Sequence, residues 1–184
     1  MTFHYEFDET DAFATGAIGR PGDRTFYVQV RAEGRTINIK CEKQQVAQMA
    51  DYLRNMLDDL PSTPTPPSPQ TAMLQDPVEQ DFVLGTVGLG LDRASQRLVV
   101  QLEEVVMVDP DEIDVDTDDP DAVLEFVRRM EDESDASLVR ILLTPGQARA
   151  FCDVAATVVQ AGRSTCKWCG GPIDPVGHAC PKMN

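Results

Sequence analysis

Two stretches of the chain place apolar residues three and four positions apart, the spacing that gives an α-helix one buried face. The first covers residues 46–60 and the second covers residues 148–159. We therefore predict one helix in each half of the chain. The apolar positions are Val46, Met49, Leu53, Met56, Leu57 and Leu60 in the first, and Ala148, Phe151, Cys152, Ala155, Val158 and Val159 in the second.

The second helix also carries start and stop signals. Residues 144–147, Thr-Pro-Gly-Gln, have the pattern of a capping box. In this motif Thr144 accepts from a backbone N–H near Gln147, and the proline occupies a place that needs no donor. Gly162 is suited to end the helix in the left-handed conformation. Gln45 stands at the matching place before the first helix.

Strand-like runs come before each helix. They are residues 26–30 and 37–41 in the first half, and residues 98–102 and 138–142 in the second. Their β-branched and large apolar residues are typical of strands. Glu33-Gly34 predicts a tight hairpin turn between the first two runs.

The two halves also share a local motif. Phe-x-x-Gly-x-x-Gly occurs at residues 13–19 and recurs 69 positions later at residues 82–88, and an Asp-Arg pair follows each copy. We predict an α+β fold made by tandem duplication of a three-strand-plus-helix unit. One such unit would leave apolar surface open, so the two copies are expected to pair edges or pack helices in one pseudo-twofold domain.

This interpretation sets the domain boundaries. The duplicated domain is predicted to cover residues 1–162, with repeat one at 1–60 and repeat two at 71–162. A linker at 61–70, rich in proline, is expected to form an extended spacer. A separate C-terminal tail covers residues 163–184.

Charge is concentrated in one insertion. The chain has 16 basic and 31 acidic residues, a net charge of −15, and residues 109–135 contain thirteen of the acidic residues and two basic ones. Such a surface disfavours a general role on nucleic acid or at an anionic membrane. The insertion lies in repeat two, at the place that the hairpin turn holds in repeat one. It is interpreted as a solvated loop, or as an acidic segment that attracts a basic partner or a cation.

The expected location is the cytoplasm. No apolar run is long enough to predict a transmembrane helix. Residues 1–7 alternate in character, unlike the basic head and apolar stretch of a signal peptide. Five cysteines, an odd number, fit reduced thiols and a metal better than a disulfide framework.

The most specific feature is a cluster of cysteine and histidine residues in the tail. The four residues are Cys166, Cys169, His178 and Cys180. A Cys-x2-Cys turn holds two thiolates at the separation that tetrahedral zinc requires, and Gly170 permits the positive φ of such a knuckle. Three thiolates and one imidazole would satisfy zinc completely, so we predict a closed structural zinc site. Two alternatives remain: a redox pair of cysteines, or no special role for these residues, with His178 as an ordinary loop histidine.

Other candidates for chemistry are weaker. His4 alternates with aromatic residues and is expected to face solvent or a sheet edge. The paired glycines lie inside strand-like segments, which indicates a bulge or a close strand crossing rather than a dinucleotide-binding turn. Cys41 and Cys152 are interpreted as small core residues. The sequence distinguishes no catalytic residue, so a non-enzymatic protein is favoured over an enzyme.

At this level the chain resembles a known family. The duplicated glycine motif, the run Thr-Pro-Gly-Gln-Ala-Arg-Ala-Phe at 144–151 and the ending from Cys166 to Pro181 resemble the actinobacterial domain-of-unknown-function family 3090. The resemblance implies a cytoplasmic bacterial protein with no assigned activity and no catalytic residues to carry over. Cys166-x-x-Cys169-Gly170 is similar to one knuckle of a zinc ribbon, from which His178-x-Cys180 departs.

Three functions follow as hypotheses. The first is a non-enzymatic binding or adaptor protein with a zinc-stabilised tail and a protein partner. The second is an RNA- or ribosome-associated factor that uses the tail, where Arg163, Lys167 and Lys182 outnumber Asp174. The third is an enzyme with a small substrate in a cleft between the repeats. No membrane contact is expected.

Overall fold

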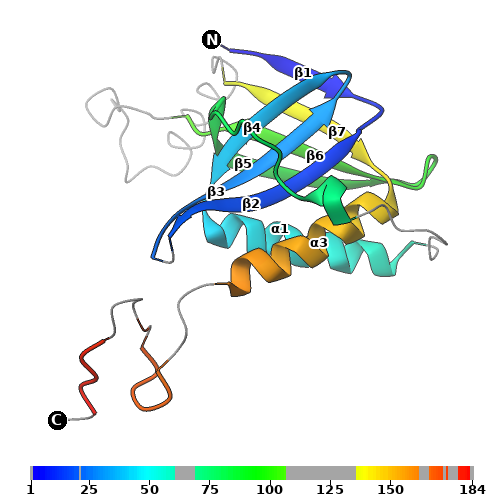
Figure 1. The fold of residues 1–184 in the computed structure, drawn as a ribbon. Helices are drawn as coiled ribbons and strands as arrows, with labels where there is room; N and C mark the ends of the chain where they lie inside the picture. The colour runs from blue at the N-terminus through cyan, green and yellow to red at the C-terminus, as the bar shows by residue number, and fades with distance from the viewer. Residues whose placement is uncertain are drawn as a thin grey trace, which may run out of the picture.

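The computed structural model describes residues 2–20, 22–60, 69–106, 136–161, 166–171, 173 and 178–182. Within these residues, seven strands and two helices form the body (Figure 1). In chain order the elements are β1 (His4–Phe7), β2 (Ala12–Arg20), β3 (Asp23–Ala32), β4 (Arg35–Cys41), α1 (Lys43–Asp58), the 3-10 turn η1 (Pro69–Ala72), β5 (Phe82–Asp92), β6 (Arg97–Glu104), β7 (Leu138–Leu143) and α3 (Pro145–Gln160).

The strands form one mixed sheet in the order β1-β7-β6-β5-β4-β3-β2. Three antiparallel strands followed by a helix occur twice, as β2-β3-β4-α1 and as β5-β6-β7-α3. The two units meet where β4 runs parallel to β5, with Ile39 opposite Phe82 and Lys40 opposite Val83. The prediction of an α+β fold is confirmed.

The seventh strand, β1, is absent from the predicted set of six. It has only four residues, and it pairs in parallel with β7, His4 opposite Leu138. Residues 3–7 alternate between apolar and polar positions, but the pairing partner lies more than 130 positions away in the sequence, so no local pattern predicts the pairing. The exposed His4 ring places Nε2 3.0 Å from the carbonyl oxygen of Ala136, at the sheet edge where the sequence placed it.

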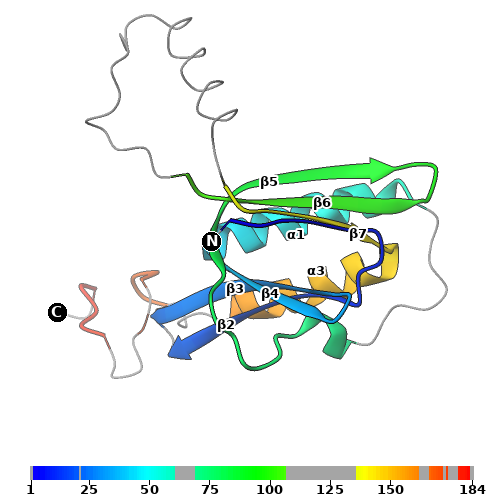
Figure 2. The same ribbon diagram turned by 90° about the horizontal axis from the view of Figure 1, so that it is seen from above.

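Both helices lie on the inner face of the curled sheet, between its two halves in Figure 2. They also pack on each other: the Cys152 thiol donates to the carbonyl oxygen of Ala50 at 3.3 Å, and Arg54 donates to the carbonyl oxygen of Cys152 at 2.8 Å. Glu42 and Gln45 form a capping box on α1, as Thr144 and Gln147 do on α3. Both predicted helices are therefore confirmed, together with the predicted capping box.

Apolar side chains from both units share one core. Phe13 of β2 stacks on Phe151 of α3 with their ring centroids 4.3 Å apart, and both rings are buried. Burying one such ring contributes about 2–3 kcal/mol. The same core includes Leu53 of α1, Leu102 of β6 and Ile141 of β7. Among the described residues, the space between the units is filled by apolar side chains, where the enzyme hypothesis expected a cleft.

A strap of residues 69–81 crosses the outer face of β2, β3 and β4 before the chain enters β5 (Figure 2). The fully buried Gln29 holds it: its amide nitrogen donates to the carbonyl oxygen of Gln75 at 2.9 Å, and its amide oxygen accepts from the N–H of Gln75 at 3.1 Å. The backbone N–H of Asn38 donates to the Asp81 carboxylate at 2.7 Å.

The end of the predicted linker differs from the expectation. Pro69 and Gln70 begin the one-turn helix η1 instead of continuing an extended spacer, because residues 70–75 are held against the sheet. The Arg31 guanidinium, for example, donates to the carbonyl oxygen of Thr71 at 3.2 Å. Residues 61–68, the acidic insertion 109–135 and Gly162 lie outside the described residues.

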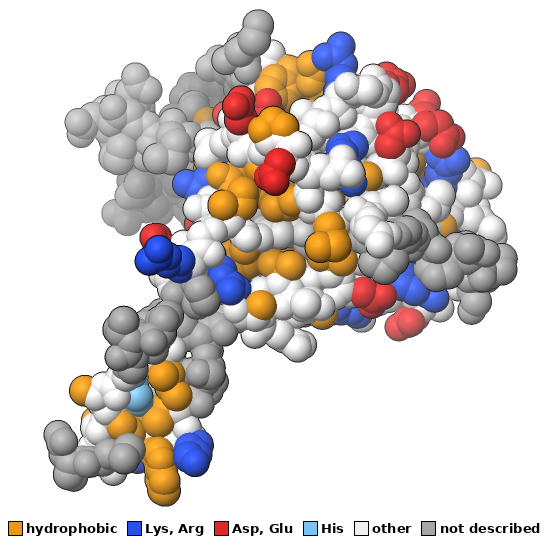
Figure 3. Space-filling model, in the orientation of Figure 1, with side chains coloured by type: hydrophobic (Ala, Val, Ile, Leu, Met, Phe, Trp, Pro, Cys, Tyr) orange, Lys and Arg blue, Asp and Glu red, His pale blue; other side chains and the backbone are white. Residues whose placement is uncertain are grey.

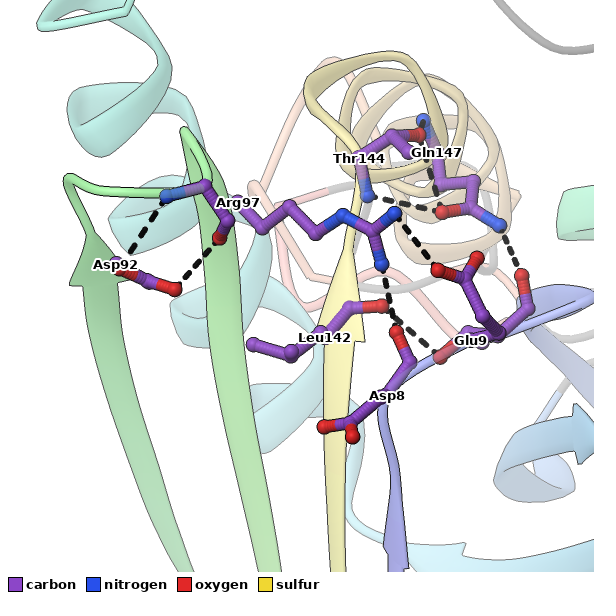
Figure 4. A network of polar contacts seen from close by, with 9 residues as sticks. Asp8, Glu9, Asp92, Arg97, Leu142, Thr144 and Gln147 are labelled. Carbon is purple, nitrogen blue, oxygen red and sulfur yellow. Dashed lines mark hydrogen bonds and ion pairs between the residues drawn. The ribbon is translucent and has the colours of Figure 1, made fainter.

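A polar network ties the turn between β1 and β2 to the second unit (Figure 4). Arg97 donates to the carbonyl oxygen of Asp8 at 2.6 Å and pairs with Glu9 at 2.9 Å. Thr10 donates its hydroxyl to the carbonyl oxygen of Leu142, and the Gln147 amide donates to the carbonyl oxygen of Thr10. The N-terminal cap of α3 thus also fixes the turn that leads into β2.

The glycine motif lies in strands, as the sequence predicts. A Cβ atom on Gly85 would lie 2.7 Å from the Val105 Cα, beside an irregularity in the β5–β6 register. A Cβ atom on Gly16 would meet the Leu74 side chain of the strap, also at 2.7 Å. These are a strand irregularity and a close chain crossing. The Glu33-Gly34 hairpin turn is confirmed as well, with φ of +52° and +73°.

Neither helix among the described residues combines the length and the apolar character needed to traverse a lipid bilayer.

Candidate metal centre

The described part of the tail starts at Cys166 with a tight turn that brings two cysteines together. The N–H of Gly170 donates to the carbonyl oxygen of Cys166 at 2.8 Å, and the N–H of Cys166 donates to the carbonyl oxygen of Gly171 at 2.7 Å. Gly170 adopts φ of +75°, which side-chain-bearing residues rarely tolerate. The turn therefore depends on the glycine that the sequence analysis selected.

Backbone amides in this turn face the sulfur atoms. N–H groups of Cys169 and Trp168 hydrogen-bond to the Cys166 sulfur and lower the pKa of that thiol to about 6. The N–H of Gly171 donates to the Cys169 Sγ at 3.4 Å. Burial raises the pKa of Cys180 instead. Amides directed at sulfur stabilise the thiolate, which is the form that binds metal ions.

His178 and Cys180, near the end of the tail, complete the cluster. The ligand atoms of Cys166, Cys169, His178 and Cys180 all lie within 4.8 Å of one another. The Cys166 and Cys180 sulfurs are 3.9 Å apart, and the Cys169 sulfur lies 3.4 Å from Nε2 of His178. With zinc–sulfur bonds of 2.3 Å, a tetrahedral site has sulfur atoms about 3.8 Å apart. The donor set and its spacing fit such an ion.

A second glycine, Gly171, lies beside the cluster. A Cβ atom at this position would lie 3.4 Å from the Cys169 sulfur and 3.8 Å from Cε1 of His178. A methyl group would fit there at van der Waals distance, whereas a longer side chain would extend further towards the cluster. The sequence predicts no role for Gly171, although two consecutive glycines follow Cys169.

The comparisons with known proteins concern the chain as a whole. Residues 5–180 match the family model described as "Protein of unknown function (DUF3090)". The chain belongs to the DUF3090 family. No curated protein and no solved structure matches it.

In this DUF3090 chain the remaining candidate residues lie apart from the tail cluster. Cys41 and Cys152 are buried in the core of the body. Burial raises the pKa of Cys41 to about 12 and the pKa of Cys152 to about 11, so both thiols stay protonated. Their interpretation as small core residues is confirmed.

Two cavities of the DUF3090 chain lie against the strap, on the outer face of the sheet. One, of about 260 Å³, is lined by residues that include Asn38, Asp76 and Asp81. The other, of about 410 Å³, is lined by residues that include Arg31 and Gln75. Neither cavity is lined by a cysteine or a histidine, and neither lies in the core between the two units. Both are therefore separate from the tail cluster.

Proposed function

We propose that the tail binds one zinc ion through Cys166, Cys169, His178 and Cys180, and that this ion is structural. The single observation that supports the proposal is the convergence of one imidazole and three sulfur atoms within 4.8 Å. Thiolate and imidazole ligands suit zinc, and four protein ligands leave no coordination position open for water. A segment of about 20 residues buries too little apolar surface to fold without such an ion.

Metal analysis of the purified, reduced protein tests this proposal. The expected result is about one zinc per chain for the wild type and a loss of most zinc for Cys166→Ser and Cys180→Ser. The matched control is Cys41→Ala, which removes a core thiol and is expected to retain the zinc. A wild-type protein without bound zinc contradicts the proposal.

We further propose that the protein is a cytoplasmic, non-enzymatic binding or adaptor protein with a protein partner. Two exposed apolar side chains, one in β2 and one in the strap, support a partner for the body. Ile18 of β2 is 46% exposed and Met73 of the strap is 54% exposed. Met73 bridges to β2 at Thr15, three positions before Ile18, and hydrophobic side chains gather on this face in Figure 3. We infer that these side chains contribute to the surface that the partner contacts.

We also propose that the two units arose by duplication and form one pseudo-twofold domain, residues 1–162. The repeated order of elements and the shared core support this view. Limited proteolysis between residues 61 and 68 tests it. Two cleaved halves that stay associated and folded agree with one domain, whereas halves that separate and fold alone contradict it.

A further inference from the structure

Trp168 is unusually open to solvent for its residue type. It is 57% exposed, whereas tryptophan side chains are highly buried on average. It lies in the turn between two candidate zinc ligands, Cys166 and Cys169, so metal binding would fix the backbone on both sides of it. A large ring held outward by a rigid turn is a ready contact surface, because little conformational freedom is lost on binding.

A cation accompanies the ring. The Lys167 ammonium lies 5.8 Å from the centre of the Trp168 ring, and Lys182 is also exposed on the tail. Hydrophobic and lysine side chains share the surface of this segment in Figure 3. Residues 163–184 contain three basic and one acidic residue, whereas the whole chain has a net charge of −15. Lys167 therefore places a positive charge beside a flat apolar ring on an otherwise acidic protein.

We propose that this turn binds single-stranded nucleic acid by stacking an unpaired base on Trp168 while Lys167 contacts the adjacent phosphate. The proposal rests on the proposed zinc site, which holds the turn. A nucleotide offers both a flat π-system and an anion, the two groups that this pair of side chains complements. An acidic peptide offers the charge but leaves the indole face without a planar partner.

The acidic body limits the size of the contact. Its charge repels a long polyanion, so binding is expected to involve one or two phosphates and to depend little on base sequence. A contact of this size gives a slope of only about −0.7 to −1.4 when the logarithm of affinity is plotted against the logarithm of salt concentration. A broad basic surface would give a much steeper slope.

The chain reports on this site directly because Trp168 is its only tryptophan. The experiment titrates the zinc-loaded full-length protein with an eight-nucleotide oligouridine, and in parallel with an oligoglutamate peptide, while indole fluorescence is recorded. The expected result is quenching by the RNA with the shallow salt slope. Equal binding of the peptide, or no quenching at low salt by a protein that contains its zinc, overturns the proposal. Absence of zinc before the titration contradicts the zinc site instead, so the two failures are distinguishable.

Variants locate the contact through the anisotropy of a labelled oligouridine. Trp168→Ala and Lys167→Ala are each expected to weaken binding about tenfold while the zinc content is unchanged. The controls are Tyr52→Ala and Lys43→Ala, which remove an exposed aromatic ring and an exposed lysine from α1. Equal losses in the α1 variants, or none in the tail variants, contradict the proposal.

Discussion

Nε2 of His178 lies 3.4 Å from the sulfur of Cys169, although eight residues separate the two in the chain. Such a short segment has little apolar core, so packing alone does not explain why a thiol and an imidazole lie this close together. Two further sulfur atoms lie within 4.8 Å of both. The proposed zinc ion, shared by all four ligand atoms, accounts for this convergence.

Bound zinc should protect the tail thiols from alkylation. With iodoacetamide at neutral pH, the native protein is expected to gain no label, because the tail thiolates hold the metal and the core thiols are buried and protonated. After the metal is removed with a chelator, labels are expected on Cys166, Cys169 and Cys180 only. Intact-mass spectrometry counts the labels, and denaturation supplies the control in which all five cysteines react. Labelling of Cys41 or Cys152 in the folded protein would contradict this account.

Gly85 should resist substitution because backbone atoms occupy the space beside it. A Cβ atom there would lie 2.7 Å from the Val105 Cα and 2.9 Å from its nitrogen, neither of which can move as a flexible side chain does. Gly85→Ala is expected to lower the free energy of unfolding by about 1–3 kcal/mol in urea denaturation. The matched control is Gly90→Ala, whose Cβ would lie at an ordinary 3.7 Å from Val99. Equal stability of the two variants would show that the close approach is not a constraint.

The local patterns of the sequence account for most of the body. Helix periodicity and capping residues predict α1 and α3, and the β-branched runs predict β3, β4, β6 and β7, because these signals depend on neighbours within a few positions. β1 and the strap escape prediction because distant residues determine them. β1 pairs with β7, and the strap is hydrogen-bonded to the buried amide of Gln29. In the sequence, Gln29 appears as an ordinary polar strand residue.

The same contrast applies to the tail. The four cluster residues could be selected from their types and spacing alone, since the spacing itself reflects the ligand geometry of zinc. The exposure of Trp168 and the space beside Gly171 could not be predicted from the sequence, because both depend on how the turn directs its side chains.

Gln29 should be essential for holding the strap. Gln29→Leu removes the partners of the Gln75 N–H and carbonyl groups, and it also removes the donor to the Asn38 side chain at 2.8 Å. The expected loss in the free energy of unfolding is about 3 kcal/mol, because each buried polar group left without a partner costs about 1–3 kcal/mol. Faster hydrogen exchange at the Gln75 amide is the local readout. Gln48→Leu, at an exposed position on α1, is the control and should change stability by less than about 0.5 kcal/mol. Unchanged exchange at Gln75 would mean that the strap is held by other contacts.

Stability should fall in alkali through Cys41. Burial raises the pKa of this thiol from about 9 to about 12. Below pH 9 the thiol is neutral in both folded and unfolded chains, so its contribution to stability is fully present. Between pH 9 and pH 12 the unfolded chain loses the proton first, and the free energy of unfolding decreases as the pH rises. At pH 10.5 the loss from this one group is about 2 kcal/mol.

Urea denaturation of the wild type and of Cys41→Ala between pH 8 and pH 10.5 measures this loss. The variant is less stable at pH 8, because it lacks a buried side chain, but its stability should decline less with pH. Parallel declines for the two proteins would mean that Cys41 ionises as easily in the folded chain as in the unfolded one.

The central claim is that three sulfur atoms and one imidazole nitrogen enclose a zinc ion in the tail. X-ray absorption at the zinc edge of the purified protein tests it most directly. The account predicts three zinc–sulfur distances of about 2.3 Å and one zinc–nitrogen distance of about 2.0–2.1 Å, with no oxygen ligand. A spectrum with a water or carboxylate oxygen in the first coordination shell, or with fewer than three sulfur atoms, would contradict it.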